Sequence, residues 1–317
     1  MKNKMYMALG LIGLTLVSCT PENNVIGNWQ KVYSPSGAPT LAFYDQGKTG
    51  TFSTNTTPAN VLAQLQTDNY GMVVFDFYNG LKSIKTNTSN YKLAKILTGG
   101  NLYLVGINKT SAPTKDDYIV SFGQNLVPDI VYKKIYGDEI ATATHYVGAV
   151  ADAQGVLTSG LHEGNPVDYV LIAQPALYAT LSNQSAATYG KLSVIASLRT
   201  EWKTLTGQDA IPQAGLFVNT EYYANHKQFF DDQFDLIDER IDTCINDPLT
   251  MKQKIDSDLD TDSQKALFGF TSQIAYNVQT SETSPNGFAL VSGDEQVDIQ
   301  EFLTSINVTD DYSSYIM

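Results

Sequence analysis

Short apolar runs alternate with helix-like windows along most of this 317-residue chain, and no other sequence feature limits the fold as strongly. The runs have the length of buried strands, and the windows between them have helical spacing. The runs lie at residues 40–44, 72–76, 94–97, 102–107, 118–122, 145–147, 169–173, 192–195 and 215–218. Helices are expected from about residue 58, at 126–136, around 150–159, at 176–182, and repeatedly after 221. This alternation predicts an α/β protein with a mostly parallel sheet flanked by helices.

Two polar stretches interrupt the alternation and predict two crossings between lobes. The first covers residues 108–117 and contains Pro113, and the second covers residues 208–213. The tight Gly-Gly turn at 98–101 predicts that 94–97 and 102–107 form a hairpin. We therefore expect a two-lobed protein whose first lobe is discontinuous in sequence. The expected division gives residues 39–112 and 214–317 to the first lobe and 113–213 to the second.

The N-terminus has the features of an export signal over residues 1–18. Lys2 and Lys4 precede an apolar stretch at 7–17, the arrangement typical of signal peptides. The tetrapeptide Leu16-Val17-Ser18-Cys19 resembles the bacterial lipobox, which implies cleavage before Cys19 and lipidation of its thiol. Residues 19–38 then form a lipid-anchored tether and lead-in. An uncleaved signal anchor and a plain secretory peptide are the alternatives.

The charge balance argues against a nucleic-acid partner. The chain has 20 Lys and Arg residues against 33 Asp and Glu residues, a formal net charge of −13. A protein that neutralises phosphates needs a basic surface, and Arg199 and Arg240 are the only arginines. Cys244 shares a predicted helical face with Ile237 and Ile241, so we expect a buried thiol that behaves as a small hydrophobic side chain.

No motif in the sequence predicts catalysis, a metal site or a cofactor. His145, His162 and His226 lack the spacing of zinc ligands, and the sequence has no nucleophile elbow, dinucleotide fingerprint or P-loop. The aspartates at 256–262 begin like a calcium loop, but Thr261 and Leu267 replace its glycine and glutamate. We therefore expect a binding protein without a cofactor.

Several segments carry a resemblance to a known family. They are 168–175 (Asp-Tyr-Val-Leu-Ile-Ala-Gln-Pro), 202–207, 211–219 and the pair Tyr222-Tyr223. Together with the export signal, they resemble the type II solute-binding lipoproteins of ABC importers, in the branch that binds sulfonates, nitrate and thiamine precursors. The resemblance implies a two-lobed type II periplasmic-binding-protein fold that closes around a small-molecule ligand by a hinge. It also implies an ABC permease and its ATPase as partners, and a lipid anchor on the extracytoplasmic face of the cell membrane.

Candidate ligand contacts follow from the predicted ends of the strands. Ligands of open α/β sheets lie beyond the carboxyl ends of the strands, beside helix N-termini. The residues at these places are Tyr44, Asp45, Gln46, Thr56, Thr57, Asp76, Phe77, Tyr78, Asn79, Ser121, Gly123, Gln124, Asn125, Gln174 and Gln213. The alternative for each is local: aromatic rings in this position pack in the core or at the rim, threonines cap helices, and amides bond nearby backbone.

The predicted ligand chemistry has two forms. Helix N-termini near Thr57 and Gly123 could hold an anion such as a sulfonate without an arginine. Tyr44, Phe77 and Tyr78, beside two aspartates, favour a flat heterocycle of the vitamin-precursor kind. Two other functional classes stay open: a surface adhesion or interaction lipoprotein on the same scaffold, and a lyase or hydrolase that uses the cleft carboxylates.

Overall fold

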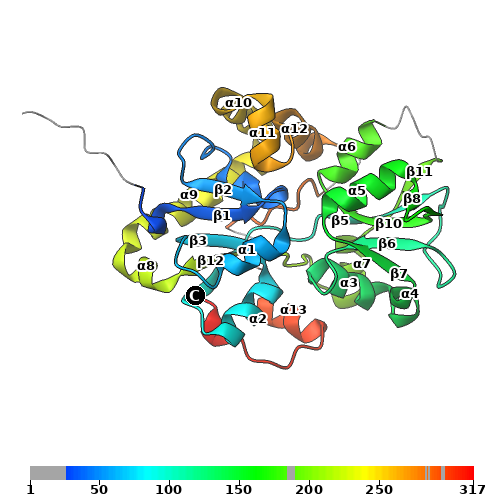
Figure 1. The fold of residues 1–317 in the computed structure, drawn as a ribbon, viewed down its shortest axis with the longest axis horizontal. Coiled ribbons are helices and arrows are strands. Elements are labelled where there is room, and N and C mark those ends of the chain that lie inside the picture. The colour runs from blue at the N-terminus through cyan, green and yellow to red at the C-terminus, as the bar shows by residue number, and fades with distance from the viewer. Residues whose placement is uncertain (1–25, 184–189, 283, 285, 294–296) are drawn as a thin grey trace, which may run out of the picture.

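The computed structural model describes residues 26–183, 190–282, 284, 286–293 and 297–317. The expected export signal and Cys19 lie outside these residues. The described chain forms two halves that lie side by side, each with a five-stranded sheet flanked by helices (Figure 1). The predicted α/β class with a discontinuous first part is confirmed.

The first sheet takes strands from both ends of the described chain. Its strands, in the order β2-β1-β3-β12-β4, are β2 (Phe52–Asn55), β1 (Val32–Pro35), β3 (Met72–Asp76), β12 (Ala214–Asn219) and β4 (Tyr91–Ile96). β1 pairs in parallel with β2 and β3, and β12 runs antiparallel between β3 and β4. The chain therefore returns to its first sheet after residue 213.

The second sheet repeats the same pattern of strand directions. Its strands, in the order β7-β6-β10-β5-β11, are β7 (Thr144–Val147), β6 (Ile119–Phe122), β10 (Tyr169–Ala173), β5 (Leu102–Ile107) and β11 (Leu192–Ser197). β6 pairs in parallel with β7 and β10, and β5 runs antiparallel between β10 and β11. In both sheets, the antiparallel strand is the first strand after a crossing. A small ribbon, β8 (Leu161–His162) with β9 (Asn165–Pro166), lies apart from these sheets.

Helices cover both sheets. In the first half they are α1 (Pro58–Gln64), α2 (Phe77–Asn87), α8 (Thr220–Asn225), α9 (Lys227–Asn246), α10 (Pro248–Asp258), α11 (Thr261–Phe268), α12 (Ser272–Thr280) and α13 (Ile299–Ser305). In the second half they are α3 (Val127–Tyr136), α4 (Asp138–Thr142), α5 (Val150–Ser159), α6 (Ala176–Ser182) and α7 (Leu198–Thr206). Short 3-10 turns are η1 (Asn28–Gln30), η2 (Ala38–Phe43) and η4 (Ser313–Tyr315). Among the described residues, no helix combines the length and the hydropathy needed to span a bilayer.

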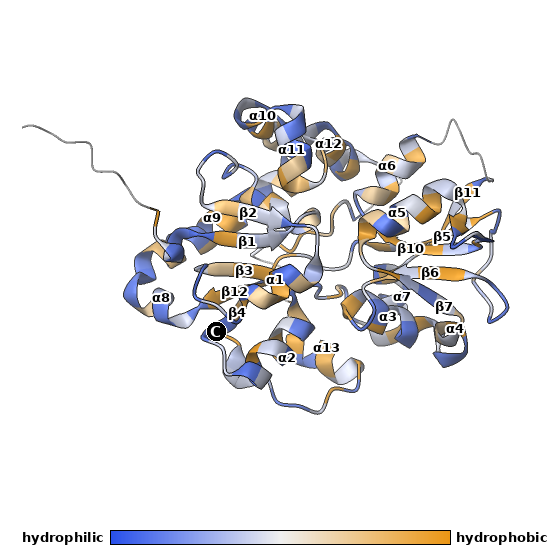
Figure 2. Cartoon of the chain, viewed as in Figure 1, coloured by the Kyte–Doolittle hydropathy of each residue, from blue (hydrophilic) through white to orange (hydrophobic). Residues whose placement is uncertain are grey.

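The central strands are buried on both faces, which explains their continuous apolar sequences. Every residue of β5, β10 and β12 is buried. Figure 2 shows apolar strands inside and polar outer faces on the helices. Cys244 is fully buried in the core of the first half, as predicted, and burial raises the pKa of its thiol.

The prediction of a strand at residues 40–44 is wrong. Residues 40–44 lie in and beside η2, where Pro39 occupies the first turn and Thr40 N donates to Gly37 O at 3.0 Å. A short apolar run buried on all sides fits a helical turn as well as a strand, and proline favours the turn. The true first strands, β1 and β2, escape the sequence pattern. β1 also lies within the expected tether at 19–38.

The hairpin predicted around residues 98–101 is also wrong. β4 pairs with β12, whereas β5 pairs with β10 and β11 in the other sheet. Residues 97–101 are therefore the first crossing, and the polar stretch at 108–117 is a loop after β5. The Gly-Gly pair instead lets the chain turn and pack closely within the crossing, because Gly100 has φ +99° and lies against Ile211. The return crossing lies between α7 and β12, as 208–213 predicts.

A close approach of α2 to β12 provides a test of this packing. A Cβ atom on Gly80 would lie 2.2 Å from Cζ of Phe217, whereas one on Gly155 in α5 would meet nothing within 4 Å. Both glycines lie inside helices, where alanine is intrinsically better by about 0.5–1 kcal/mol. We expect Gly80→Ala to lower the free energy of unfolding by about 1–3 kcal/mol through overpacking, and Gly155→Ala to raise it. Urea unfolding of both variants measures the difference, and equal effects would contradict the packing.

Candidate ligand-binding site

A cavity of about 230 Å³ lies between the two halves. The strands that end at it are β1, β2 and β3 of the first sheet and β6, β7 and β10 of the second, and β5 and β12 begin there. Its described lining is Pro35, Ser36, Gly37, Ala38, Pro39, Asn55, Thr56, Pro58, Phe75, Asp76, Thr98, Asn101, Phe122, Gly123, Leu126, Pro128, Gly148, Ala149, Val150, Ala151, Ala173, Gln174, Pro175, Gln213 and Ala214. The cavity thus occupies the place where the strand-end rule puts a ligand.

Two full-length helices of the second half point their N-termini at this cavity. Leu126 and Pro128 belong to the start of α3, and Ala149, Val150 and Ala151 belong to the start of α5. The N-cap residues, Leu126 and Ala149, provide no capping side chain. The first backbone N–H groups of such helices need acceptors from elsewhere.

Asp76 supplies one of these acceptors from the other half. Its Oδ1 accepts from the backbone N of Asn79 at 2.9 Å and from Asn79 Nδ2 at 3.1 Å, which caps α2. Its Oδ2 accepts from the backbone N of Val127 at 2.7 Å, at the start of α3. Asn79 Nδ2 also donates to the backbone O of Asn125 at 2.9 Å. One carboxylate therefore caps a helix in each half.

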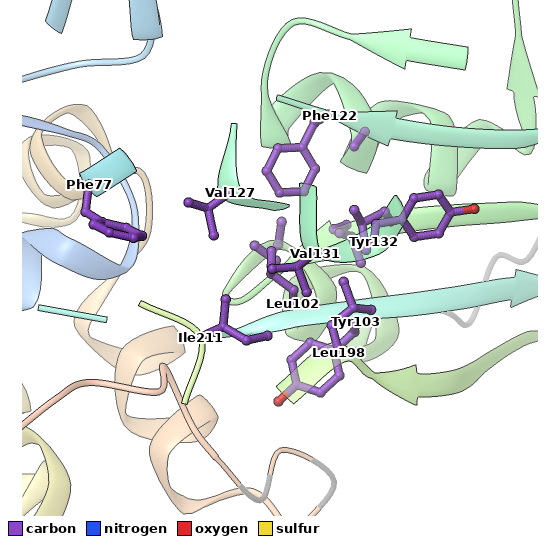
Figure 3. Packing of buried hydrophobic residues seen from close by; sticks show 14 of the residues in the cluster. Phe77, Leu102, Tyr103, Phe122, Val127, Val131, Tyr132, Leu198 and Ile211 are labelled. Atoms are coloured by element: carbon purple, nitrogen blue, oxygen red, sulfur yellow. The ribbon is translucent and has the colours of Figure 1, made fainter. Parts of the chain in front are cut away.

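The packing around this contact is apolar. Phe77, Phe122, Val127 and Ile211 belong to one buried cluster that includes residues from both halves (Figure 3). Burial raises the pKa of the Asp76 carboxyl, and its hydrogen bonds with Asn79 and Val127 oppose the shift.

Gln174 has a structural role at the edge of the cavity. Its backbone N donates to Asn101 O and its backbone O accepts from Asn101 Nδ2, both at 3.0 Å. Its Oε1 accepts from the backbone N of Tyr178 at 3.0 Å, and its Nε2 donates to Ser284 Oγ. Both ends of the amide are engaged, which ties β10 and α6 to the first crossing and to the chain after α12.

Two buried acceptors beside the cavity have no partner. They are Oδ1 of Asn101, a residue 3% exposed, and Oε1 of Gln213. Asn101 belongs to the first crossing and Gln213 to the second. The orientation of the Asn101 amide is fixed because its Nδ2 donates to Gln174 O.

The structure brings five of the predicted contacts to the cavity. These are Thr56, Asp76, Gly123, Gln174 and Gln213. Asn79 and Asn125 lie beside it in the contact between halves. Thr57 is the N-cap of α1, and Gln124 is exposed in the loop before α3.

The other predicted contacts lie elsewhere. Tyr44, Asp45 and Gln46 follow η2, and Asp45 Oδ1 lies 2.7 Å from Nε of Arg240. Phe77 and Ser121 are fully buried, and Tyr78 packs its ring against Tyr312. The aromatic set that favoured a flat ring is therefore not assembled around this cavity, because residues 40–44 form η2 and Phe77 begins α2 on its buried face.

Much of the lining lies at positions with no clear signal in the sequence. Pro35 ends the missed strand β1, the stretch from Ser36 to Pro39 follows it, and Asn55 ends the missed strand β2. Residues 148–151 have small side chains that give no chemical signal. Their position before a predicted helix, after the run at 145–147, is the one feature that could have identified them.

The described residues give no sign of a metal centre. His145 and His162 flank Tyr118, which stacks on His145 at a centroid distance of 4.1 Å and places its OH 3.0 Å from Nδ1 of His162. No group of three or more His, Cys, Asp or Glu side chains in the described ranges is placed to hold an ion.

Solved structures share this architecture. An ABC transporter protein from Parabacteroides distasonis matches with a TM-score of 0.55 at 16% identity, over 85% of this chain and 100% of that chain. The ligand-binding component of an ABC-type import system from Staphylococcus aureus, with zinc bound, matches with a TM-score of 0.64 at 10% identity, over 90% and 95%. The alkanesulfonate-binding protein of Xanthomonas axonopodis pv. citri, bound to MOPS, matches with a TM-score of 0.56 at 8% identity, over 90% and 96%.

The chain has the fold of periplasmic solute-binding proteins. The predicted resemblance is thereby confirmed for the fold. No protein-family model and no curated protein sequence matches the chain. At these identities the similarity concerns architecture, and the ligand must be inferred from the residues of this cavity.

The different bonding of Gln174 and Gln213 leads to a prediction. Gln174→Ala leaves the backbone N–H of Tyr178 without its acceptor, so we expect the free energy of unfolding to fall by about 1–3 kcal/mol. Gln213→Ala removes an oxygen that has no donor, so we expect a smaller loss. Chemical denaturation of both variants measures the ranking. A larger loss for Gln213→Ala would show that Gln213, not Gln174, holds this region together.

Proposed function

We propose that this protein is an extracytoplasmic solute-binding protein of an ABC-type importer and that it binds a small organic solute in the cavity between its halves. The observation that supports this most directly is the cavity itself. It lies where strand ends and helix N-termini of both sheets converge, and the chain crosses between the halves beside it.

The two halves act as lobes in this proposal. The first lobe comprises residues 28–97 and 214–317, and the second comprises residues 102–207. Bending at the crossings opens the cavity to solvent, and a ligand that contacts both lobes favours the closed form through its differential affinity.

The membrane arrangement follows from the N-terminal sequence. Lipidated Cys19 holds the protein at the extracytoplasmic face, and a permease with its ATPase accepts the solute from the closed form. The protein binds and releases its solute without chemical change. Permease and ATPase genes beside the gene for this chain would support this arrangement.

A cavity-filling variant tests the proposed site. Ala151 is exposed at the start of α5 and lines the cavity. Ala151→Trp places an indole in the ligand volume without disturbing the core, so we expect loss of ligand binding with an unchanged melting temperature. The probe is the set of compounds that co-purify with the native protein, identified by mass spectrometry and titrated back by calorimetry.

A matched variant controls for the added tryptophan. Ala266 is exposed in α11 and does not line the cavity, so Ala266→Trp should bind as the native protein does. Full affinity in Ala151→Trp would rule out this cavity as the site. Recovery of no bound compound from native protein, even after incubation with cell extract, would count against the solute-binding function.

A further inference from the structure

The N-terminus of α3 is already occupied by a carboxylate of the protein. α3 has ten residues, and Leu126 at its N-cap cannot accept a hydrogen bond through its side chain. Asp76 Oδ2 accepts from Val127 N at 2.7 Å across the gap between the halves. At α3, the place where the helix would attract an anionic ligand is thus filled by Asp76, which also brings its own negative charge to the cavity.

The lining provides no positive charge to compensate a second anion. Asp76 is the one charged side chain among the described residues that line the cavity, and none of them is Lys, Arg or His. Lys82 is close enough to lower the pKa of Asp76 slightly, but it belongs to α2 outside the lining. A sulfonate or nitrate would therefore meet the charge of Asp76 in an apolar, poorly screened space, where like charges repel strongly.

The two crossings instead require hydrogen-bond donors. Asn101 Oδ1 and Gln213 Oε1 are buried acceptors without partners, and a buried acceptor left unsatisfied costs about 1–3 kcal/mol. Both residues line the cavity, so we expect an N–H or O–H group of a bound solute to satisfy them. Because one acceptor lies on each crossing, such a solute would also stabilise the hinge.

The remaining lining is mostly apolar, apart from Ser36, Asn55, Thr56, Thr98 and Gln174. Phe75, Phe122, Leu126 and Val150 contribute large side chains, and prolines and alanines make up most of the rest. A surface of this kind binds the hydrocarbon part of a solute and leaves recognition to a few polar groups.

We propose that the cavity selects an uncharged solute with N–H or O–H donors on a compact apolar body, and that Asp76 excludes anions from it. This inference rests on the proposed solute-binding function. It differs from the flat-ring prediction, because it depends on Asp76, Asn101 and Gln213 and not on Tyr44, Phe77 or Tyr78.

Isosteric pairs of probes test the selection directly. Benzenesulfonamide and benzenesulfonate, and benzamide and benzoate, differ in charge and donor groups while keeping nearly the same shape. Calorimetric titration of native protein should show the neutral member of at least one pair binding about tenfold or more tightly than its anion. Equal or tighter binding of the anions, or no binding of any neutral member, would overturn the proposal.

Two variants test whether Asp76 causes the preference for uncharged solutes. Asp76→Asn removes the charge and keeps the size, so we expect the neutral-to-anion affinity ratio to fall about tenfold. Asp260→Asn removes the same charge from the N-cap of α11, where Asp260 Oδ1 accepts from Ser263 N outside the cavity, and it should leave the ratio unchanged. An unchanged ratio in Asp76→Asn would remove the role given to Asp76.

The compound recovered from the native protein separates this inference from the function on which it rests. Recovery of an uncharged compound with N–H or O–H groups supports both. Recovery of an anion overturns the inference and leaves the solute-binding function intact. Recovery of nothing counts against the function, and the isosteric pairs alone then decide the inference.

Discussion

Each crossing between the halves leads directly into a central strand of the other sheet, and the architecture depends on this constraint. β5 and β12 start at the cavity and run antiparallel to their neighbours, so the parallel strands of both sheets must end at the cavity. The crossings also bond to each other: Ile211 N donates to Gly99 O, and Gln213 N donates to Thr98 O, both at 3.0 Å. Strand ends, helix N-termini and the two crossings are thereby gathered in one place.

The sequence predicted the elements whose signal is local. β3, β10 and β12 are apolar runs bounded by polar residues, and their burial on both faces is what makes such runs recognisable. β1 and β2 have mixed sequences, because only some of their residues are buried. The prediction of a hairpin at 98–101 was wrong for a different reason. A Gly-Gly pair signals a chain reversal or a close approach equally well, and here Gly99 N donates to Ala289 O, a partner far away in sequence.

The site residues were likewise predictable only where their signal in the sequence was local. Asp76 was predictable because it ends a clear strand, but its partner Val127 belongs to a helix of the other half, and no local pattern reports that contact. Tyr44 and Tyr78 have side chains typical of ligand contacts. Tyr44 is nevertheless buried in the core of the first half, and the ring of Tyr78 packs against Tyr312. Small residues such as Ala149 and Ala151 shape the cavity with their backbone, and a sequence shows nothing of backbone direction at a helix start.

A small number of hydrogen bonds joins the two halves directly. Asp76 to Val127, Asn79 to Asn125 and Gln174 to Ser284 are hydrogen bonds across the gap, and each contributes a net of about 0.5–1.5 kcal/mol. This arrangement also leaves Asn101 Oδ1 and Gln213 Oε1 without donors, which offsets part of that gain. In the proposed function, a ligand that supplies those donors adds its differential affinity for the closed form to these contacts.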